Sequence, residues 1–165
     1  MIVNSDPIST RFEPLQASGA EVPWVGCELS AKQTVVRDKR ILLVEDQEPL
    51  RAHLRMMLEL DGHQVTEASN GAEALISYTI GEFDLVITDF EMPVMEGNKL
   101  AVSLKVLAPS LPILMITASD RARGDAENPV DALLNKPSTV SDLRCALGNL
   151  LSGRPDPAQP SAVLA

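Results

Sequence analysis

The chain has few aromatic residues and no excess of basic residues, and both absences limit what it can do. Aromatics make up 3% of the 165 residues, with one Trp and one Tyr, so a core has to be built mainly from Leu, Ile, Val, Ala and Met. The formal net charge is -9. Residues 38–152 hold most of it, with 10 Lys/Arg against 18 Asp/Glu. Because an acidic surface repels phosphate backbones, we expect no binding of nucleic acid.

Long apolar runs, closely spaced cysteines and a Gly-rich nucleotide loop are also missing. No stretch reaches the roughly 18 apolar residues of a membrane span, and the N-terminus shows no basic region followed by an apolar run. Cys27 and Cys145 lie far apart, which favours reduced thiols. We therefore expect a cytoplasmic protein that does not enter a membrane. The lack of Gly-x-x-x-x-Gly-Lys-Ser/Thr argues against a P-loop nucleotide enzyme.

Two proline-interrupted segments flank a patterned middle. Residues 1–37 and 153–165 show no helical or strand period, and we expect both to be largely disordered. Residues 38–152 are long enough for one domain with a substantial core. Because too few residues follow 152 for a second domain, we expect a stand-alone domain. Trp24 is the only tryptophan, and we hypothesise that it anchors a partner or folds onto the domain.

Within the middle segment, apolar strand-like runs alternate with amphipathic helical runs. The strands are expected at 40–45, 63–68, 83–88, 113–117 and 130–134. The helices are expected up to Gly62, then at about 71–80, 98–107 and 139–151, with a short one within 119–129. Almost wholly apolar strands that alternate with helices predict an α/β fold with a doubly wound parallel sheet. Such folds bind ligands beyond the carboxyl ends of the strands.

Polar residues stand at four of these carboxyl ends. They are Glu45, Asp46, Asp89, Thr117 and Lys136. Three carboxylates at one sheet edge would repel one another unless a pKa rises or a cation binds, and oxygen ligands of this kind suit Mg²⁺. A carboxylate at position 89 is either a metal ligand or a nucleophile that forms an acyl phosphate. A hydroxyl and an ammonium beside it would hold phosphoryl oxygens.

Each residue has a simpler explanation when it is taken alone. An acid such as Asp46 after a strand can cap the next helix, Thr117 is an ordinary β-branched strand residue, and a surface lysine is usually solvated. Their arrival at one edge is what favours a site. The Lys136–Pro137 step is a candidate for a cis peptide bond that would fix the loop carrying the lysine.

The motifs that contain these residues resemble the receiver domain of two-component response regulators. The motifs are Val44-Glu45-Asp46, Thr88-Asp89-Phe90-Glu91-Met92-Pro93-Val94-Met95-Glu96-Gly97, Thr117-Ala118-Ser119 and Lys136-Pro137. The resemblance covers about residues 38–152. It implies a flavodoxin-like sheet of five parallel strands in the order 2-1-3-4-5, with helices on both faces. It also implies a phosphoprotein that signals by protein–protein interaction in a two-component or phosphorelay system.

The resemblance further implies a role for each residue of the site. Asp89 would accept a phosphoryl group from a phosphohistidine on a sensor histidine kinase or histidine phosphotransfer protein. Asp46 and Asp89 would ligate Mg²⁺, Glu45 would assist through water, and the backbone carbonyl of Glu91 would complete the protein ligands. Thr117 and Lys136 would hold the phosphoryl oxygens. Beyond its own phosphorylation and slow dephosphorylation, the chain would not be an enzyme.

Three departures from the family pattern concern the acid pair and the output. Glu45 stands where the family more often has Asp, and Leu133 stands where it has a switch aromatic. Only 18 residues separate Thr117 from Lys136, so the helix expected within 119–129 should be short or mobile. We therefore expect phosphorylation chemistry of the usual kind and an unusual route from the phosphoryl group to the partner.

Two other functions fit parts of this pattern. A pseudo-receiver would keep the fold as an interaction module without being phosphorylated. An aspartyl-phosphate phosphatase of the haloacid dehalogenase type would need a second Asp two residues after the nucleophile, where this chain has Glu91. Glu91 and Ser119 flank the expected pocket, and we hypothesise that they tune hydrolysis of the acyl phosphate.

Overall fold

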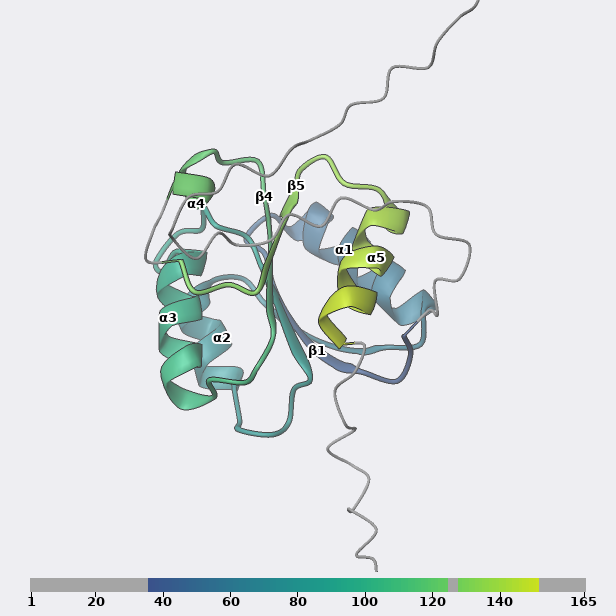
Figure 1. The fold of residues 1–165 in the computed structure, drawn as a ribbon, viewed down its shortest axis with the longest axis horizontal. Coiled ribbons are helices and arrows are strands. Elements are labelled where there is room, and N and C mark those ends of the chain that lie inside the picture. The colour runs from purple at the N-terminus through teal and green to yellow at the C-terminus, as the bar shows by residue number, and fades with distance from the viewer. Residues whose placement is uncertain (1–35, 125–127, 152–165) are drawn as a thin grey trace, which may run out of the picture.

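The computed structural model describes residues 36–124 and 128–151 (Figure 1). Trp24 and nearly all of the two segments expected to be disordered, 1–37 and 153–165, lie outside the described residues. Among the helices that are described, none has the length and apolar character needed to cross a membrane.

Five strands alternate with five helices in the described part of the chain. The strands are β1 (Arg40–Val44), β2 (Gln64–Ala68), β3 (Leu85–Thr88), β4 (Ile113–Thr117) and β5 (Ala132–Asn135). The helices are α1 (Glu48–Leu60), α2 (Gly71–Ser77), α3 (Gly97–Leu107), α4 (Arg121–Gly124) and α5 (Val140–Leu151). The strand order is β2-β1-β3-β4-β5 with parallel pairing throughout. The predicted doubly wound sheet is therefore confirmed.

The sheet separates two apolar layers. Helices α1 and α5 cover one face, and α2, α3 and α4 cover the other (Figure 1). Alternate residues of β1 point into different layers: Leu43 packs with Leu58 of α1 and Leu147 of α5, whereas Val44 packs with Leu100 of α3. Strands covered on both faces must be apolar throughout. The fully buried β3 and β4 are accordingly apolar up to their terminal Thr residues, whereas the edge strand β2 alternates between exposed and partly buried residues.

Helix ends follow the expected local chemistry. Pro49 occupies the first turn of α1, where its missing N–H would have no helical partner. Thr139 caps α5, because its Oγ1 accepts from the Asp142 backbone N–H at 3.2 Å. In return, the Asp142 carboxylate accepts from the Thr139 N–H at 2.8 Å. This reciprocal pair is a capping box.

Two predicted boundaries differ from the structure around the α2–β3 connection. Helix α2 ends at Ser77 rather than at residue 80, and β3 begins at Leu85 rather than at residue 83. The chain reverses at Gly81, whose φ is +81°, a conformation that glycine adopts without strain. This turn brings the rings of Tyr78 and Phe83 together with centroids 6.1 Å apart. The apolar pattern continued through both residues because they pack against the core from a loop.

The fifth strand also shifts, to Ala132–Asn135 from the expected 130–134. Asp131 lies just before it and holds the start of β4, since its carboxylate accepts from the Ile113 N–H at 2.8 Å. The strands then run side by side to Thr117 and Asn135. The carboxyl ends of β1, β3, β4 and β5 thus meet at one edge of the sheet, where the predicted site residues lie.

Candidate functional site

Three carboxylates converge at the carboxyl edge of the sheet. Glu45 and Asp46 follow β1 and Asp89 follows β3, and these two strands are neighbours. One carboxylate oxygen from each residue lies within 4.8 Å of the other two. Glu45 is 2% exposed and Asp89 is 7% exposed, so water screens their mutual repulsion poorly. The predicted acidic cluster therefore exists as a group of atoms close enough to share one cation.

A single ammonium group bridges two of these acids. Lys136 Nζ lies 2.6 Å from Asp89 Oδ2 and 2.8 Å from Glu45 Oε2. Burial raises the pKa of Glu45, against the opposing effect of Lys136, and the nearby charge of Asp89 raises it further. Burial alone would lower the pKa of Lys136, but its hydrogen bonds to Asp89 and Glu45 outweigh this and raise it. One ammonium facing three carboxylates leaves the cluster short of positive charge.

Asp46 supplies the evidence that a further cation belongs here. Its Oδ1 is buried and has no hydrogen-bond partner among the described residues. The N-cap of α1 is Gln47, which makes no side-chain cap bond, so the simple explanation of Asp46 as a helix cap is wrong. A buried carboxylate oxygen without a donor costs free energy. A hard divalent cation with oxygen ligands would satisfy it, and the donor set fits such an ion.

Arg51 holds the loop that carries the acid pair. Its Nη1 donates to the Glu45 carbonyl at 2.7 Å and lies 3.4 Å from the Asp46 carbonyl, while its Nε pairs with Glu67 at 3.4 Å. The guanidinium thus ties the end of β1 to the edge strand β2. Our reading of the sequence missed Arg51. A basic residue in the first turns of a helix gives no sign in the sequence of which carbonyl groups it reaches.

The loop after β3 is folded back onto Asp89. The Phe90 N–H donates to Asp89 Oδ1 at 2.6 Å, and the Thr88 hydroxyl donates to the Asp89 carbonyl at 2.9 Å. The Gly97 N–H donates to the Phe90 carbonyl at 2.9 Å. A Cβ at position 97 would lie 1.9 Å from the Asp89 carbonyl oxygen. Glycine is needed at position 97 because the start of α3 touches the backbone of Asp89.

Asp89 opens on a hollow of ≈ 220 Å³. The residues that line it are Gln47, Asp89, Glu91, Thr117, Ala118, Ser119 and Lys136. Thr117 is buried, and its Oγ1 accepts from the Ser119 N–H at 3.1 Å. The Lys136 N–H donates to the Thr117 carbonyl at 2.9 Å, which joins the ends of β4 and β5. The Lys136–Pro137 peptide bond is cis, as predicted.

The rim of this hollow contains a second set of polar contacts. The Ser119 hydroxyl donates to Glu91 Oε1 at 2.8 Å, and Arg121 Nη1 lies 3.9 Å from the same oxygen. The Arg121 guanidinium carbon sits 5.5 Å from the centroid of the Phe90 ring, a cation–π distance. Arg121 begins α4, which has four residues, so the prediction of a short fourth helix is confirmed.

Leu133 lies beneath this rim as a core residue. It is 3% exposed and belongs to the apolar cluster that also contains Phe90, Met115 and Val130. No aromatic ring is therefore available at position 133 to turn between a buried and an exposed position.

A parallel α/β domain with a lysine-bridged acidic cluster at the carboxyl edge defines a narrow class of protein. The model of the response regulator receiver domain family matches residues 41–147, and the chain belongs to this family.

Several curated proteins are similar to this chain. The response regulator receiver protein CpdR of Brucella abortus is 40% identical over 108 residues, which cover 64% of this chain and 90% of CpdR. The autoinducer 1 sensor kinase/phosphatase LuxN of Vibrio campbellii is 33% identical over 68% of this chain but only 13% of LuxN. The transcriptional regulatory protein PrrA of Mycobacterium tuberculosis is 32% identical over 78% of this chain and 57% of PrrA. The chain thus spans a small part of LuxN and about half of PrrA.

Solved structures show the same fold. The response regulator TrrA of Thermotoga maritima, in complex with Mg²⁺ and BeF, matches with a TM-score of 0.64 and 32% identity over 68% of this chain and 99% of the TrrA chain. The non-phosphorylated HemR receiver domain of Leptospira biflexa matches with a TM-score of 0.64 and 33% identity over 72% and 99% of the two chains.

Proposed function

We propose that Asp89 accepts a phosphoryl group from a phosphohistidine on a sensor histidine kinase or a histidine phosphotransfer protein. The supporting observation is that Asp89, unlike Glu45 and Asp46, lines the hollow beside Thr117 and Lys136. An incoming phosphoryl group therefore meets one carboxylate, one hydroxyl and one ammonium. The unit that performs this chemistry would be residues 38–152.

In the transfer we propose, a carboxylate oxygen of Asp89 attacks phosphorus as the phosphorus–nitrogen bond to the donor histidine breaks. The bonding electrons return to the imidazole nitrogen, and an acyl phosphate remains on Asp89. Lys136 would move from the carboxylates toward the phosphoryl oxygens, and the Thr117 hydroxyl would donate to one of them. These residues act by positioning and charge neutralisation, which is what a loose phosphoryl transfer requires.

We infer that Mg²⁺ binds at the acidic cluster during this reaction. Asp46 and Asp89 would be direct ligands together with the backbone carbonyl of Glu91, and Glu45 would assist through water. When bound, the ion supplies positive charge that offsets the anionic phosphoryl group and the carboxylates. The partnerless Asp46 oxygen is the feature of this chain that argues for the ion.

Glu91 and Ser119 would set the lifetime of the phosphorylated protein. Their hydrogen bond at 2.8 Å crosses the rim of the hollow, on the side that is open to water. Replacing Ser119 by Ala removes this bond and should change the rate of dephosphorylation. Ser103→Ala, which removes a hydroxyl on α3 that bonds only within its own helix, is the control. Equal lifetimes for both variants would remove Ser119 and Glu91 from this role.

We propose that the chain signals through contacts with a downstream protein. Because Leu133 cannot act as a rotating aromatic, the response would lie in the β4–α4 connection. Movement of Thr117 and Ser119 toward a phosphoryl oxygen would break the Ser119–Glu91 bond and release the start of α4. The similar proteins differ in their output, since they include a sensor kinase and a transcriptional regulator. We therefore propose the downstream contact from the chemistry of the site.

Incubation with Mg²⁺ and acetyl phosphate tests the proposed function. We expect an acid-stable, base-labile phosphoryl adduct that is absent in Asp89→Asn and absent when Mg²⁺ is removed by a chelator. Asp84→Asn, at the opposite edge of the sheet, is the matched control and should keep the adduct. Failure of the wild-type protein to form an adduct would favour a pseudo-receiver. Sustained turnover of a phosphomonoester would favour the phosphatase.

A further inference from the structure

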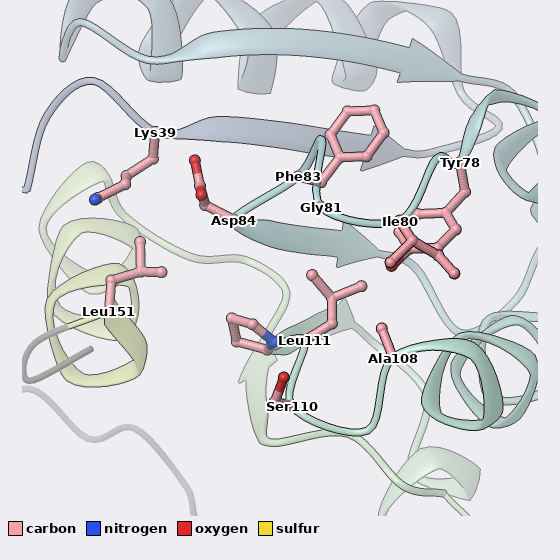
Figure 2. A pocket seen from close by; sticks show the side chains of 11 residues that line it. Lys39, Tyr78, Ile80, Gly81, Phe83, Asp84, Ala108, Ser110, Leu111 and Leu151 are labelled. Carbon is pink, nitrogen blue, oxygen red and sulfur yellow. The ribbon is translucent and has the colours of Figure 1, made fainter. Parts of the chain in front are cut away.

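The amino edge of the sheet contains a second hollow, larger than the first. Its volume is ≈ 510 Å³, within the usual range of ligand and side-chain pockets. Lys39, Asp84 and Pro112 line it from the positions just before β1, β3 and β4, and Leu151 lines it from the end of α5. Figure 2 shows Lys39 and Leu151 at one end and Tyr78 and Ile80 at the other. Nothing in the proposed phosphoryl chemistry uses this hollow.

The chemistry of its walls suits an aromatic ring. Tyr78 and Phe83 form one wall with their rings stacked at an interplanar angle of 22°, and Leu111 adds an aliphatic surface. Asp84 does not leave a free charge in the hollow, because Arg40 binds both of its oxygens at 2.8–3.2 Å. Lys39 lies at the opposite end of the hollow from Tyr78 (Figure 2). The aromatic and apolar contacts favour an indole.

Within the part of the chain that the structure describes, the rim of the hollow is apolar and exposed. Ile80 lines it and is 67% exposed. Val106 and Leu107, which precede the lining residue Ala108 at the end of α3, are exposed as well. Isolated exposed apolar residues are common, but a group of them around a hollow marks a surface that something covers.

We propose that Trp24, with its neighbours Pro23 and Val25, occupies this hollow. The place where the N-terminal segment joins the domain supports this choice. Lys39 lines the hollow, and a short stretch of chain separates it from Trp24. The 14 residues between Trp24 and Lys39 can span about 50 Å when extended. A domain of this size has a radius of gyration of about 13 Å, so the indole reaches the hollow easily. A tether of this length gives an effective concentration in the millimolar range.

The C-terminal segment is the competing occupant from the same chain. It departs from Leu151, which also lines the hollow, and its apolar residues Val163 and Leu164 are aliphatic. A tryptophan buries more area than either of these residues and can also stack on Tyr78 and Phe83. The aromatic wall therefore favours Trp24, and fluorescence separates the two segments.

Fluorescence of the full chain tests the proposal directly, because Trp24 is the only tryptophan. In the wild-type protein we expect emission at a shorter wavelength than in the denatured chain and weak quenching by acrylamide. Both should be unchanged on dilution, because the contact is intramolecular. In a nuclear Overhauser spectrum, the single indole should show contacts to the rings of Tyr78 and Phe83.

A matched pair of substitutions on the same chain segment locates the contact. Ile80→Asp places a charge on the rim, and Ile76→Asp makes the same change on α2 at a residue that is 86% exposed and does not line the hollow. We expect Ile80→Asp to lower the docked-to-undocked ratio about tenfold, which corresponds to about 1.4 kcal/mol of lost apolar contact. Ile76→Asp should leave it unchanged. Ser110→Phe fills the hollow from an exposed position and should also release Trp24.

Three results would overturn the proposal. The first is that acrylamide quenches Trp24 as strongly in the native wild-type protein as in the denatured chain. The hollow would then be occupied by the C-terminal segment or by another molecule. Equal fluorescence of the wild type, Ile80→Asp and Ser110→Phe proteins would place Trp24 elsewhere. Loss of the protected signal on dilution would show that Trp24 binds a second copy of the chain.

Discussion

The carboxylates at the two edges of the sheet differ in how completely their charge is paired. At the amino edge, Asp84 is bound by Arg40 through three hydrogen bonds and Asp131 is bound by Lys105 at 2.7 Å. At the carboxyl edge, three carboxylates share Lys136, and one oxygen of Asp46 has no partner among the described residues. The amino edge is arranged for stability. The carboxyl edge keeps an uncompensated charge, as functional sites often do.

The pKa values follow the same division. Burial tends to raise the pKa of Asp84, but its hydrogen bonds from Arg40 overcome this and lower it. Burial raises the pKa of Glu45 even though Lys136 lies 2.8 Å away. Asp84 has its own arginine and stabilises the folded protein. Glu45 shares Lys136 with Asp89, so its negative charge is only partly compensated.

The largest expected effect is on the packing that positions Asp89. Gly97→Ala places a Cβ against the Asp89 carbonyl, so the start of α3 or the end of β3 must move. We expect the free energy of unfolding to fall by about 3 kcal/mol or more, at the upper end for overpacking. Gly148→Ala is the control, because its Cβ meets nothing within 4 Å and alanine favours a helix by about 1 kcal/mol. Urea denaturation measures both, and equal stabilities would contradict the close contact at Gly97.

The next largest effect on stability distinguishes Lys136, at the carboxyl edge, from Lys105, at the amino edge. Lys136→Met removes the cation between Glu45 and Asp89 and should destabilise the metal-free protein by about 2–3 kcal/mol. Addition of Mg²⁺ should restore much of this loss. Lys105→Met at the amino edge breaks a pair with Asp131 in which the two side chains are 18% and 34% exposed, and it should cost about 1 kcal/mol, with no rescue by Mg²⁺. Thermal denaturation with and without Mg²⁺ tests this, and equal rescue of both variants would argue against a cation at the acidic cluster.

A smaller effect compares two aspartates. Asp84→Asn weakens three hydrogen bonds to Arg40 and should lower the free energy of unfolding by about 1–2 kcal/mol. Without divalent cations, Asp46→Asn should leave it unchanged or raise it slightly, because no donor to Asp46 Oδ1 is lost and one of three clustered negative charges is removed. The Mg²⁺-induced rise in Tm should disappear in Asp46→Asn and persist in Asp84→Asn. A Mg²⁺-induced rise that survives in Asp46→Asn would exclude Asp46 as a ligand.

The smallest effect is the pH dependence of the Asp84 contribution. Because its folded pKa is lowered, its stabilising effect is present above the unfolded pKa of about 3.9. The effect is then lost as the pH falls through the lowered folded pKa. The stability difference between the wild type and Asp84→Asn should be constant from pH 7 to about pH 5 and should shrink below about pH 4. A difference that grew on acidification would contradict this sign.

The sequence predicted a parallel sheet, because buried parallel strands read as continuous apolar runs. The strand order was predicted by the resemblance of the motifs at the strand ends to a known family. The sequence also predicted that one edge of the sheet carries Glu45, Asp46, Asp89, Thr117 and Lys136, and the structure places them there. These predictions rest on short-range patterns. Residues that act through the packing of distant segments were invisible at that level.

Arg51 and the hollow at the amino edge illustrate the difference. Arg51 matters because its side chain reaches back to two carbonyl groups at the end of β1, and an arginine on a helix surface gives no sign of this. The hollow is lined by Lys39, Tyr78, Ser110 and Leu151, which are far apart in the sequence. The early end of α2 belongs to the same group, because Tyr78 leaves the helix to pack beside Phe83.

Chemical trapping identifies the residue that carries the phosphoryl group. Borohydride reduces an acyl phosphate on aspartate to homoserine, which a peptide mass spectrum locates by residue. After incubation with acetyl phosphate and Mg²⁺, we expect homoserine at position 89, at the carboxyl edge, and none when Mg²⁺ is chelated. Conversion at another acid of the chain, or at Asp89 regardless of Mg²⁺, would contradict this expectation.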